Sequence, residues 1–574
     1  MTDPASTSVR APGFALGDAA EAYGVAVERA RTEEWATRLF DHDVTLWSTD
    51  PEVGAAIAQR LGWLSAPVGF EDNVPALEGF GDGMVDAGFT TAVVAGMGGS
   101  SLAPDVLRRT FGTTEGYLDL RVLDSTDPAA VGAAFGDLDP LKTLVIIASK
   151  SGTTTEPNAF LEYFWDLAHK ALDTIHHHVY QTPGGLIVAI TDPGPSLEAI
   201  PHHDQFREVF LNPPDIGGRY SALTYVGLVP ASLIGLDLDA LLASAIAMLG
   251  ACREPDAARN PGVSLGIAMG TLAKAGRDKL TFLADDEIAA FGAWAEQLIA
   301  ESTGKHGLGI VPVDLEPLGA PVAYGGDRVI VRLSVADGTD GGRDALANAL
   351  EAAGHPVIRI ALADPIDLGG EFVRWEVATA IAGAVLGIDP FDQPDVEQAK
   401  QKTRDALARA GRGEPMFEGP VHDPTDPAIA GALAAHLARR APNAYLALQA
   451  FIASTPARDE ALTRIRAVLR DGTRNATTAG YGPRFLHSTG QLHKGGAPIG
   501  WFLQLTADHP DDRKIPGWPY TFGQLIDGQA AGDIGALDGR GLPIMRIHLG
   551  ADPDAGLAAL ERALEAALRI IPEA

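Results

Sequence analysis

Residues Leu141–Glu156 constrain the fold of this chain more than any other stretch. Leu144–Ala148 form a continuous apolar run, which is typical of a strand buried on both faces in a parallel sheet. A turn rich in hydroxyls follows at once, with glycine at 152 and lysine at 150, and the segment Phe160–Leu172 has the apolar periodicity of a helix. A strand, a polar turn and a helix start in this order predict an anion site, because free N–H groups and the helix dipole favour negative charge. Helix capping by Ser and Thr is the alternative interpretation.

A second turn of this kind precedes it. Thr91–Ala95 predicts a strand and Leu102–Thr110 a helix, with the glycine-rich turn GMGGSS between them. The turn does not match a dinucleotide fingerprint, since Ser101 occupies the third glycine position, and no Walker A lysine pattern occurs in the chain. The alternation of strands and helices continues along the chain and predicts a parallel α/β sheet with ligands at the carboxyl ends of its strands. Two neighbouring turns are therefore expected to converge on one small phosphate.

Composition and charge exclude several classes of protein. A chain of 574 residues with 46% hydrophobic content is expected to form two or more domains. It has no apolar run long enough for a membrane span and no secretory leader at its start, which predicts a cytoplasmic protein. The net charge of −31 disfavours nucleic-acid binding but leaves room for an anionic metabolite at a local cluster of donors. The single cysteine, Cys252, excludes an internal disulfide.

The division of the chain is expected to follow this pattern. We expect a helical lead-in at residues 1–75 and a first α/β subdomain at 76–255. This subdomain contains the two phosphate-binding turns, together called the phosphate cradle. A second α/β subdomain is expected at 256–400. Residues 401–574 are expected to form a helical insertion and a C-terminal region; the role of 401–480 is open. Helical composition at Ala428–Ala441 and Ala444–Ile452 predicts helices, whereas Trp501–Thr506 and Pro543–Leu549 predict strands.

Four motifs occur in an order that resembles one family. They are GMGGSSLAP, SKSGTTTE, GGRYSALTYVGL and AEQLIAESTGKHG. This order resembles glucose-6-phosphate isomerases of the sugar-isomerase (SIS) superfamily, and the resemblance spans about residues 90–400. It implies two doubly wound parallel-sheet SIS subdomains, each a three-layer α/β/α unit, with helical extensions. It also implies interconversion of glucose 6-phosphate and fructose 6-phosphate, in glycolysis and gluconeogenesis, without metal, nucleotide or redox cofactor. The most similar variety is the isomerase half of bifunctional transaldolase–glucose-6-phosphate isomerases, although residues 1–75 are too few for a transaldolase barrel.

The resemblance assigns the binding residues. The sugar phosphate would be held by two turns, through Gly99, Ser100, Ser149, Lys150, Ser151 and Thr154. Hydroxyls and backbone donors at two helix starts, with one lysine, suit a phosphate. Gln297 would make a supporting contact.

The resemblance also assigns the catalytic residues. Glu301 would move the proton between C2 and C1, and Arg219 would steady the anionic intermediate. Glu296 is expected to be an ordinary surface glutamate. Lys400, in FDQPDVEQAK, would assist ring opening.

Three histidines are candidates for the residue that opens the sugar ring. The family motif is matched best by LHSTGQ, which points to His487, but this segment follows Lys400, whereas the family histidine normally precedes the lysine. His306 and His493 are competing candidates. An imidazole is suited to this proton shuttle near neutral pH. The run His176–His178 is expected to be solvent-exposed, with no metal.

Two other functions stay open at this point. One is an isomerase for a different phosphosugar, such as mannose 6-phosphate. The other is a non-catalytic sugar-phosphate sensor on the SIS fold, which Glu301 in its full ESTGK context and the absence of a DNA-binding motif disfavour. The expected partner is a small sugar phosphate, with no nucleic acid and no membrane. The resemblance suggests a homodimer, while the sequence leaves the oligomeric state and a separate transaldolase partner open.

Overall fold

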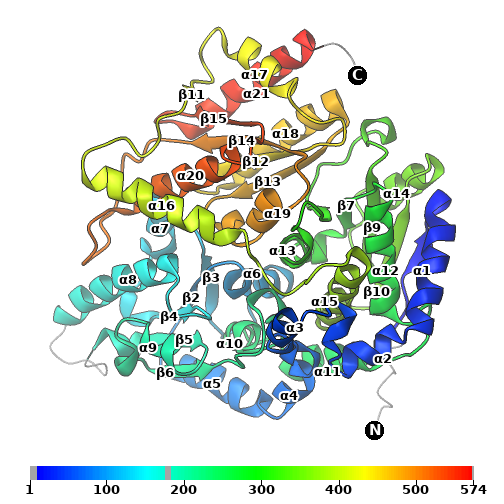
Figure 1. Ribbon diagram of the computed structural model, residues 1–574. Coiled ribbons are helices and arrows are strands. Elements are labelled where there is room, and N and C mark those ends of the chain that lie inside the picture. Colours follow the sequence, from blue (N-terminus) through cyan, green and yellow to red (C-terminus); the bar gives the residue numbers. More distant parts are fainter. Residues whose placement is uncertain (1–8, 175–181, 572–574) are drawn as a thin grey trace.

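Three β-sheets, each covered by helices, make up the computed structural model, which describes residues 9–174 and 182–571 (Figure 1). Each sheet has five strands, and all pairings are parallel except that of the first strand. The expected α/β fold with parallel sheets is confirmed. The histidine run His176–His178 lies outside the described residues.

The first sheet has the strand order β3-β2-β4-β5-β6. Its strands are β2 (Thr91–Gly96), β3 (Asp119–Leu123), β4 (Thr143–Ala148), β5 (Ile187–Thr191) and β6 (Glu208–Leu211). β4 is buried at every residue, as its apolar run predicts. The chain places β3 on one side of β2 and β4 on the other, so the strand order reverses between β2 and β4. Open parallel sheets bind ligands in the crevice at such a reversal.

The two predicted turns leave β2 and β4 at this reversal. They lead directly into α6 (Gly99–Phe111) and α8 (Thr155–Asp173). The remaining helices of this unit are α7 (Pro128–Phe135) and α9 (Pro195–Glu198).

The second sheet has the order β1-β10-β9-β7-β8. Its strands are β1 (Gly13–Ala15), β7 (Lys279–Ala284), β8 (Val311–Val313), β9 (Arg328–Val335) and β10 (Val357–Leu362). α13 (Phe291–Thr303) follows β7, and α14 (Arg343–Ala352) lies between β9 and β10 in the chain. β1 comes from the expected helical lead-in, which is otherwise mainly helical: α1 (Ala20–Thr32), α2 (Trp35–Phe40), α3 (Pro51–Ala58), α4 (Ala66–Glu71) and α5 (Val74–Asp86).

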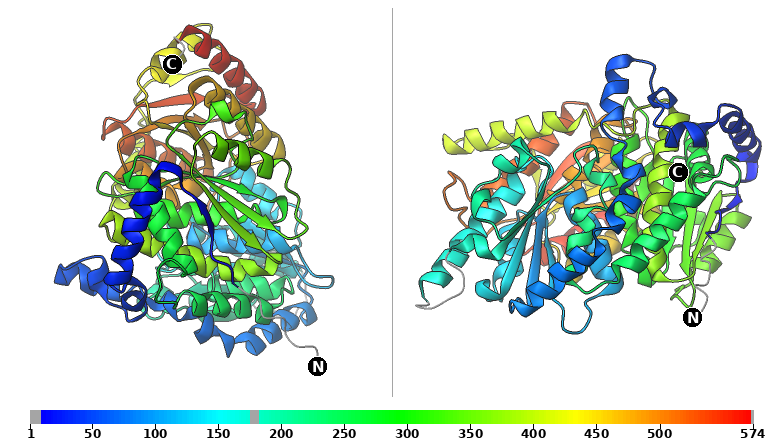
Figure 2. Two further views of the ribbon diagram at one scale, coloured as in Figure 1. Left: turned by 90° about the vertical axis from the view of Figure 1, so that its right-hand side faces the viewer. Right: turned by 90° about the horizontal axis from the view of Figure 1, so that it is seen from below.

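Long helices join the first two sheets through one hydrophobic core. They are α10 (Tyr225–Leu233), α11 (Leu238–Ala251), α12 (Pro261–Lys274) and α15 (Leu368–Leu386). α15 is buried along almost its whole length because it packs against both α11 and α12. The N-terminal helices, dark blue in Figure 2, lie on the outside of this part, with α1 against α12.

The third sheet corrects the expectation of a helical insertion. Its order is β11-β15-β14-β12-β13, and its strands are β11 (Val421–His422), β12 (Tyr445–Phe451), β13 (Ala476–Tyr481), β14 (Gly500–Thr506) and β15 (Ile544–His548). The helix expected at Ala444–Ile452 is therefore wrong, since β12 occupies it. A strand buried on both faces gives a short apolar run that periodicity cannot separate from a helix. The strands expected at Trp501–Thr506 and Pro543–Leu549 are confirmed.

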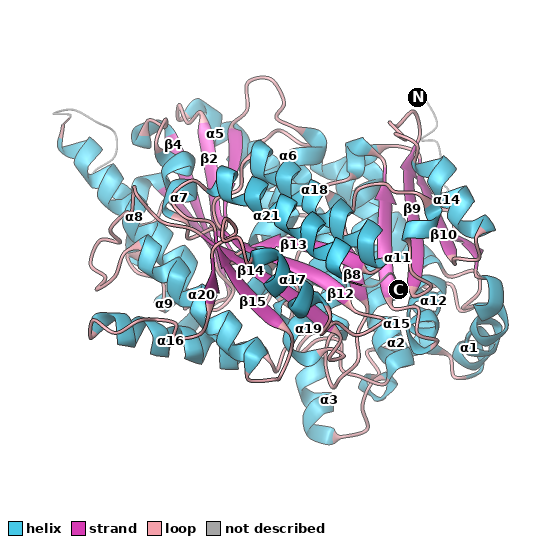
Figure 3. Ribbon diagram, turned by 90° about the horizontal axis from the view of Figure 1, so that it is seen from above, coloured by secondary structure: helices cyan, strands magenta, loops and turns pink. Residues whose placement is uncertain are grey.

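Helices cover both faces of this third sheet. They are α16 (Val396–Gly411), α17 (Ile429–Leu437), α18 (Pro456–Thr473), α19 (Gly490–Gly495), α20 (Phe522–Asp538) and α21 (Pro553–Ile570). Trp501 and Leu503 of β14 join a core with α17, α18 and α21, which lie together over one face (Figure 3). Gln504 points to the other face, where it donates to Ala530 O of α20 at 2.9 Å. None of the helices in the described part of the chain combines the length and apolar character needed to cross a lipid bilayer.

Candidate active site

A cavity of about 550 Å³ opens at the strand reversal of the first sheet. Its walls come from the turns after β2 and β4, from α13, from α16 and from the segment before α19. Every binding and catalytic residue expected from the sequence lines it: Gly99, Ser100, Ser149, Lys150, Ser151, Thr154, Arg219, Gln297, Glu301, Lys400 and His487. Segments far apart in the chain therefore build one site.

The turn after β2 allows a close backbone approach. A Cβ atom on Gly99 would lie 2.0 Å from Gly218 O, in the segment that carries Arg219. Gly98 has φ +55° and also packs against His487 O. Glycine at these two positions brings the start of α6 against the arginine and histidine segments.

The turn after β4 holds its hydroxyls by contacts within the turn. Ser149 Oγ donates to Thr154 Oγ1 at 3.2 Å, and the hydroxyls of Ser151 and Thr153 lie 3.0 Å apart. Thr154 is the N-cap of α8 but makes no capping bond with its side chain. The capping interpretation therefore does not describe Thr154, and the start of α8 keeps the donors that suit an anion.

Lys150 is paired within the protein. Its Nζ donates to Asp192 Oδ2 at 2.5 Å and to Pro214 O at 2.9 Å. Its charge is thus partly compensated before any ligand binds. Arg60, which follows α3, lines the same cavity and has no carboxylate partner among the described residues.

Glu301 lies in the last turn of α13 and faces Arg219. Arg219 Nη1 and Glu301 Oε1 are 3.3 Å apart, and Gln297 Nε2 donates to Glu301 Oε2 at 3.1 Å. The same Gln297 nitrogen donates to His487 O at 2.8 Å. Gln297 therefore connects the carboxylate with the histidine segment.

The Arg219 guanidinium is held from several sides. It is 3% exposed, and Nε donates to Ser302 Oγ at 2.8 Å. Nη2 donates to Pro390 O and Asp392 O, and Nη1 donates to Gln393 Oε1. These bonds fix the plane of the guanidinium against Glu301, so its position is set before a substrate binds.

His487 reaches the cavity from the turn before α19, and its ring is oriented by Glu156. Its Nε2 donates to Glu156 Oε1 at 3.1 Å, and the carboxylate is 5% exposed in the first turn of α8. Burial alone raises the pKa of Glu156, but the charge and hydrogen bond of His487 outweigh it, so this pKa lies below its usual value. Gln529 Nε2 of α20 also donates to Glu156, at 2.6 Å, and its Oε1 accepts from Thr126 Oγ1.

The two competing histidines lie elsewhere. His306 is exposed in a turn with φ +55° and is not among the residues of the cavity wall. His493 is buried beside Tyr445 and Phe502, and burial lowers its pKa well below the usual value. Of the three candidates, the structure brings His487 to Glu301 and Lys400.

Lys400 lies on α16 at the edge of the active-site cavity. It lines the main cavity and an adjoining space of about 450 Å³ that also contains Glu156 and Gln529. Its positive charge contributes to the lowered pKa of Glu156.

Comparisons with known proteins identify the family of this chain. Residues 76–327 match the sequence model of a family described as phosphoglucose isomerase. A glucose-6-phosphate isomerase from Rubrobacter xylanophilus is 31% identical over 407 residues, which span 62% of this chain and 92% of that relative. The chain belongs to the glucose-6-phosphate isomerase family.

Further relatives support the same family and fold. A glucose-6-phosphate isomerase from Heliobacterium modesticaldum is 28% identical over 407 residues, 62% of this chain and 88% of that protein. The crystal structure of a hypothetical protein from Thermus thermophilus superposes with a TM-score of 0.55 at 23% identity. That alignment covers 69% of this chain and all (100%) of the other. The family resemblance stated from the motifs is confirmed.

Three further residues of the site have no role predicted from the sequence. Glu156 ends the motif SKSGTTTE without a predicted role, and Arg60 lies in the expected helical lead-in. Lys305, in ESTGK, is buried, and its Nζ donates to Asp389 O and Asp392 O, both at 2.7 Å. Burial, followed by the charge of Arg219, lowers the pKa of Lys305 to about 8. It holds the same loop that binds Arg219, and its place in the motif is the signal that could have indicated it.

The expectation that Glu296 is a surface glutamate is wrong. Glu296 is half-buried and lines a separate cavity of about 620 Å³, behind the histidine segment, together with Asp314. Burial, and then the charge of Asp314, raise the pKa of Glu296 to about 8. The helical pattern of α13 could not show that residues of a third α/β unit, such as Arg466 and Tyr481, line the same cavity.

Proposed function

We propose that this chain interconverts D-glucose 6-phosphate and D-fructose 6-phosphate, as an aldose–ketose isomerase that works through a cis-enediol. The observation that carries the proposal is the cavity in which the Glu301–Arg219 pair and His487, itself bonded to Glu156, lie with the hydroxyl-rich turns of two helix starts. Membership of the isomerase family supports it. The reaction would serve glycolysis and gluconeogenesis.

The phosphate end of the substrate binds at the start of α6 and α8. Ser100, Ser149, Ser151 and Thr154 supply hydroxyls, and the first backbone N–H groups of the helices supply further donors. Lys150 adds a positive charge. This cradle orients the sugar and leaves its C1–C2 end toward α13.

Ring opening comes first. His487 gives a proton to the ring oxygen as the bond from C1 to that oxygen breaks, and its imidazole then takes the proton of the C1 hydroxyl as the aldehyde forms. Glu156 keeps the imidazole oriented during this transfer. Lys400 assists from the rim of the cavity.

Proton transfer follows. The Glu301 carboxylate takes the proton from C2, the electron pair forms the C1–C2 double bond, and the C1 oxygen carries the negative charge. Arg219 stabilises this charge with fixed donors. The proton of the C2 hydroxyl then passes to the C1 oxygen, the C2–O bond becomes a carbonyl as the double bond shifts, and Glu301 returns its proton to C1, so the carboxylate is regenerated.

The finer assignments belong to the same proposal. Similarity to the isomerase half of bifunctional transaldolase–glucose-6-phosphate isomerases stays a prediction from the sequence motifs. A cytoplasmic location is supported by the family. Glu301, Arg219, Lys400 and His487 lie on one chain, so the expected homodimer is not required to complete the site.

Turnover by the purified chain tests this function. Formation of glucose 6-phosphate from fructose 6-phosphate, in the presence of EDTA, is the expected result. Preference for mannose 6-phosphate would instead favour the related isomerase, and binding of both sugars without turnover would favour a sensor.

A further inference from the structure

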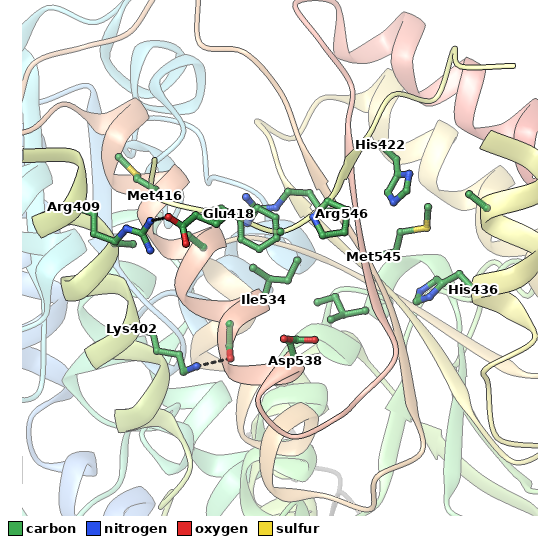
Figure 4. Close-up of a pocket in the computed structure, with 18 of the residues that line it drawn as sticks. Lys402, Arg409, Met416, Glu418, His422, His436, Ile534, Asp538, Met545 and Arg546 are labelled. Atoms are coloured by element: carbon green, nitrogen blue, oxygen red, sulfur yellow. Dashed lines mark hydrogen bonds and ion pairs between the residues drawn. The ribbon is translucent and has the colours of Figure 1, made fainter. Parts of the chain in front are cut away.

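A cavity of about 630 Å³ lies in the third α/β unit, separate from the active site (Figure 4). It is bounded by β15, by α16, α17 and α20, and by the loop at residues 412–420. Its lining shares no residue with the active-site cavity. Its size falls within the range of ligand pockets, about 300–1,000 Å³.

Arg546 of β15 is the distinctive group in this cavity. It is 8% exposed, and its Nε donates to Gln504 Oε1 at 2.7 Å. Its Nη2 has no hydrogen-bond partner, and no carboxylate in the described ranges forms an ion pair with the side chain. Arg328, by contrast, is buried and pairs with Glu316 at 2.9 Å.

A buried and unpaired guanidinium is unfavourable by itself. Removing a charge from water destabilises the fold unless a partner restores the lost interactions. Burial lowers the pKa of Arg546 to about 10, although Asp527 and Asp533 oppose this. The buried guanidinium of Arg546 therefore destabilises the empty fold, and an anion bound beside it in the cavity would offset this loss.

The surroundings of Arg546 combine apolar walls with charged groups, among them Asp405 and Asp538. Phe417 stacks on its guanidinium, 4.1 Å from the ring centre, and Ile534 and Met545 form further walls. Arg409 of α16 forms an ion pair with Glu418, as Figure 4 shows. This pair joins α16 to the loop that carries Phe417. Lys402 Nζ donates to Gly535 O at 2.6 Å and joins α16 to α20 beside the cavity.

We propose that this cavity binds a small organic anion, whose carboxylate or phosphate group pairs with Arg546 and whose apolar body fills the space beneath Phe417. Guanidinium recognises both groups with paired donors. The apolar walls select an anion with a hydrocarbon or aromatic body over an inorganic ion. The same two helices, α16 and α20, also carry Lys400 and Gln529, so the site lies one helix layer from the active site.

Calorimetric titration of the full chain tests this proposal. The probes are benzoate and phenyl phosphate, with benzyl alcohol as an uncharged match, and fructose 6-phosphate saturates the active site throughout. The variants are Arg546→Gln and Ala432→Phe, which fills the cavity, with Arg464→Gln as a control at an exposed ion pair of α18.

We expect saturable 1:1 binding of at least one anion, weakened at least tenfold by Arg546→Gln and by Ala432→Phe but unchanged by Arg464→Gln. Comparison of the two probes identifies the preferred anionic group. Absence of saturable binding by both anions, or equal binding by the two cavity variants and the native chain, would overturn the proposal. Melting curves of each variant, with and without probe, show whether it is folded and whether the anion stabilises it.

Discussion

The Nε2 atom of His487 lies 3.1 Å from Oε1 of Glu156, and the two residues come from different α/β units of the chain. Glu156 begins α8 beside the first sheet, whereas His487 precedes α19 beside the third. The contact therefore couples the position of the candidate proton shuttle to the docking of these two units.

Glu156→Gln should lower kcat for fructose 6-phosphate by about 10- to 100-fold, the size of effect seen for partners that orient a functional histidine. The KM should change little, because Glu156 orients His487 and is not part of the phosphate cradle. Steady-state kinetics of the two variants Glu156→Gln and Glu162→Gln check this. Glu162 lies on the same helix, near His202 and outside the site, and its variant should behave as native. An unchanged kcat in Glu156→Gln would contradict the assignment.

Arg60→Gln should raise the KM for fructose 6-phosphate by about three- to tenfold, the effect of losing roughly 1 kcal/mol of charge-assisted binding. Lys150 is already paired with Asp192, so Arg60 is the cation with more charge to offer to a phosphate. The apparent affinity for inorganic phosphate as an inhibitor should fall by the same factor. Arg31→Gln, at an exposed pair of α1, is the control. A KM that stays at the native value would remove Arg60 from the binding site.

Gly99→Ala should reduce kcat/KM by about 100-fold or more, since displacing positioned groups by about 1 Å has effects of this size. The added methyl group would meet Gly218 O and push the Arg219 segment away from Glu301. Gly83→Ala in α5 is the matched control, because a Cβ there meets nothing within 4 Å. It should leave activity unchanged. Native activity in Gly99→Ala would show that the close approach of the two turns is not needed.

Glu296→Gln should stabilise the protein at alkaline pH. Because the pKa of Glu296 is raised to about 8 in the fold, the native chain binds more protons than the unfolded chain from about pH 4.3 to about pH 8. The contribution of this residue to stability is therefore full at low pH and is lost as the pH rises through 8.

Melting temperatures across pH 4–9 check this expectation. The melting temperatures of Glu296→Gln and of the native protein should agree near pH 4, with the variant higher by a few degrees at pH 8.5. A difference that is independent of pH, or opposite in sign, would contradict the raised pKa.

The sequence allowed the residues that line the main cavity to be predicted, while their roles stay predictions. Each turn of the phosphate cradle is a continuous motif after a buried strand, and strand order in a doubly wound sheet brings such turns together. Glu301, Gln297 and Arg219 could be assigned because their motifs occur in one order. The parallel sheets themselves followed from alternating apolar runs.

The parts that could not be predicted depend on contacts between distant segments. β12, Tyr445–Phe451, is rich in Ala and Leu, a composition that also suits a helix. Its pairing with β13 and β14 shows that it is a strand. Glu156, Arg60 and Glu296 look like ordinary charged residues until another unit covers or faces them. The LHSTGQ match favours His487, but its contact with Glu156 and its place in the cavity depend on the packing of the third unit against the first.

The central claim is that Glu301 moves the proton between C2 and C1, and Glu301→Gln tests it most directly. The amide keeps the size of the side chain but cannot accept the proton. With EDTA present, the native chain should convert fructose 6-phosphate to glucose 6-phosphate, and the variant should lose at least about 100-fold in kcat while still binding the sugar. A Glu301→Gln protein that turns over substrate at the native rate would contradict the account.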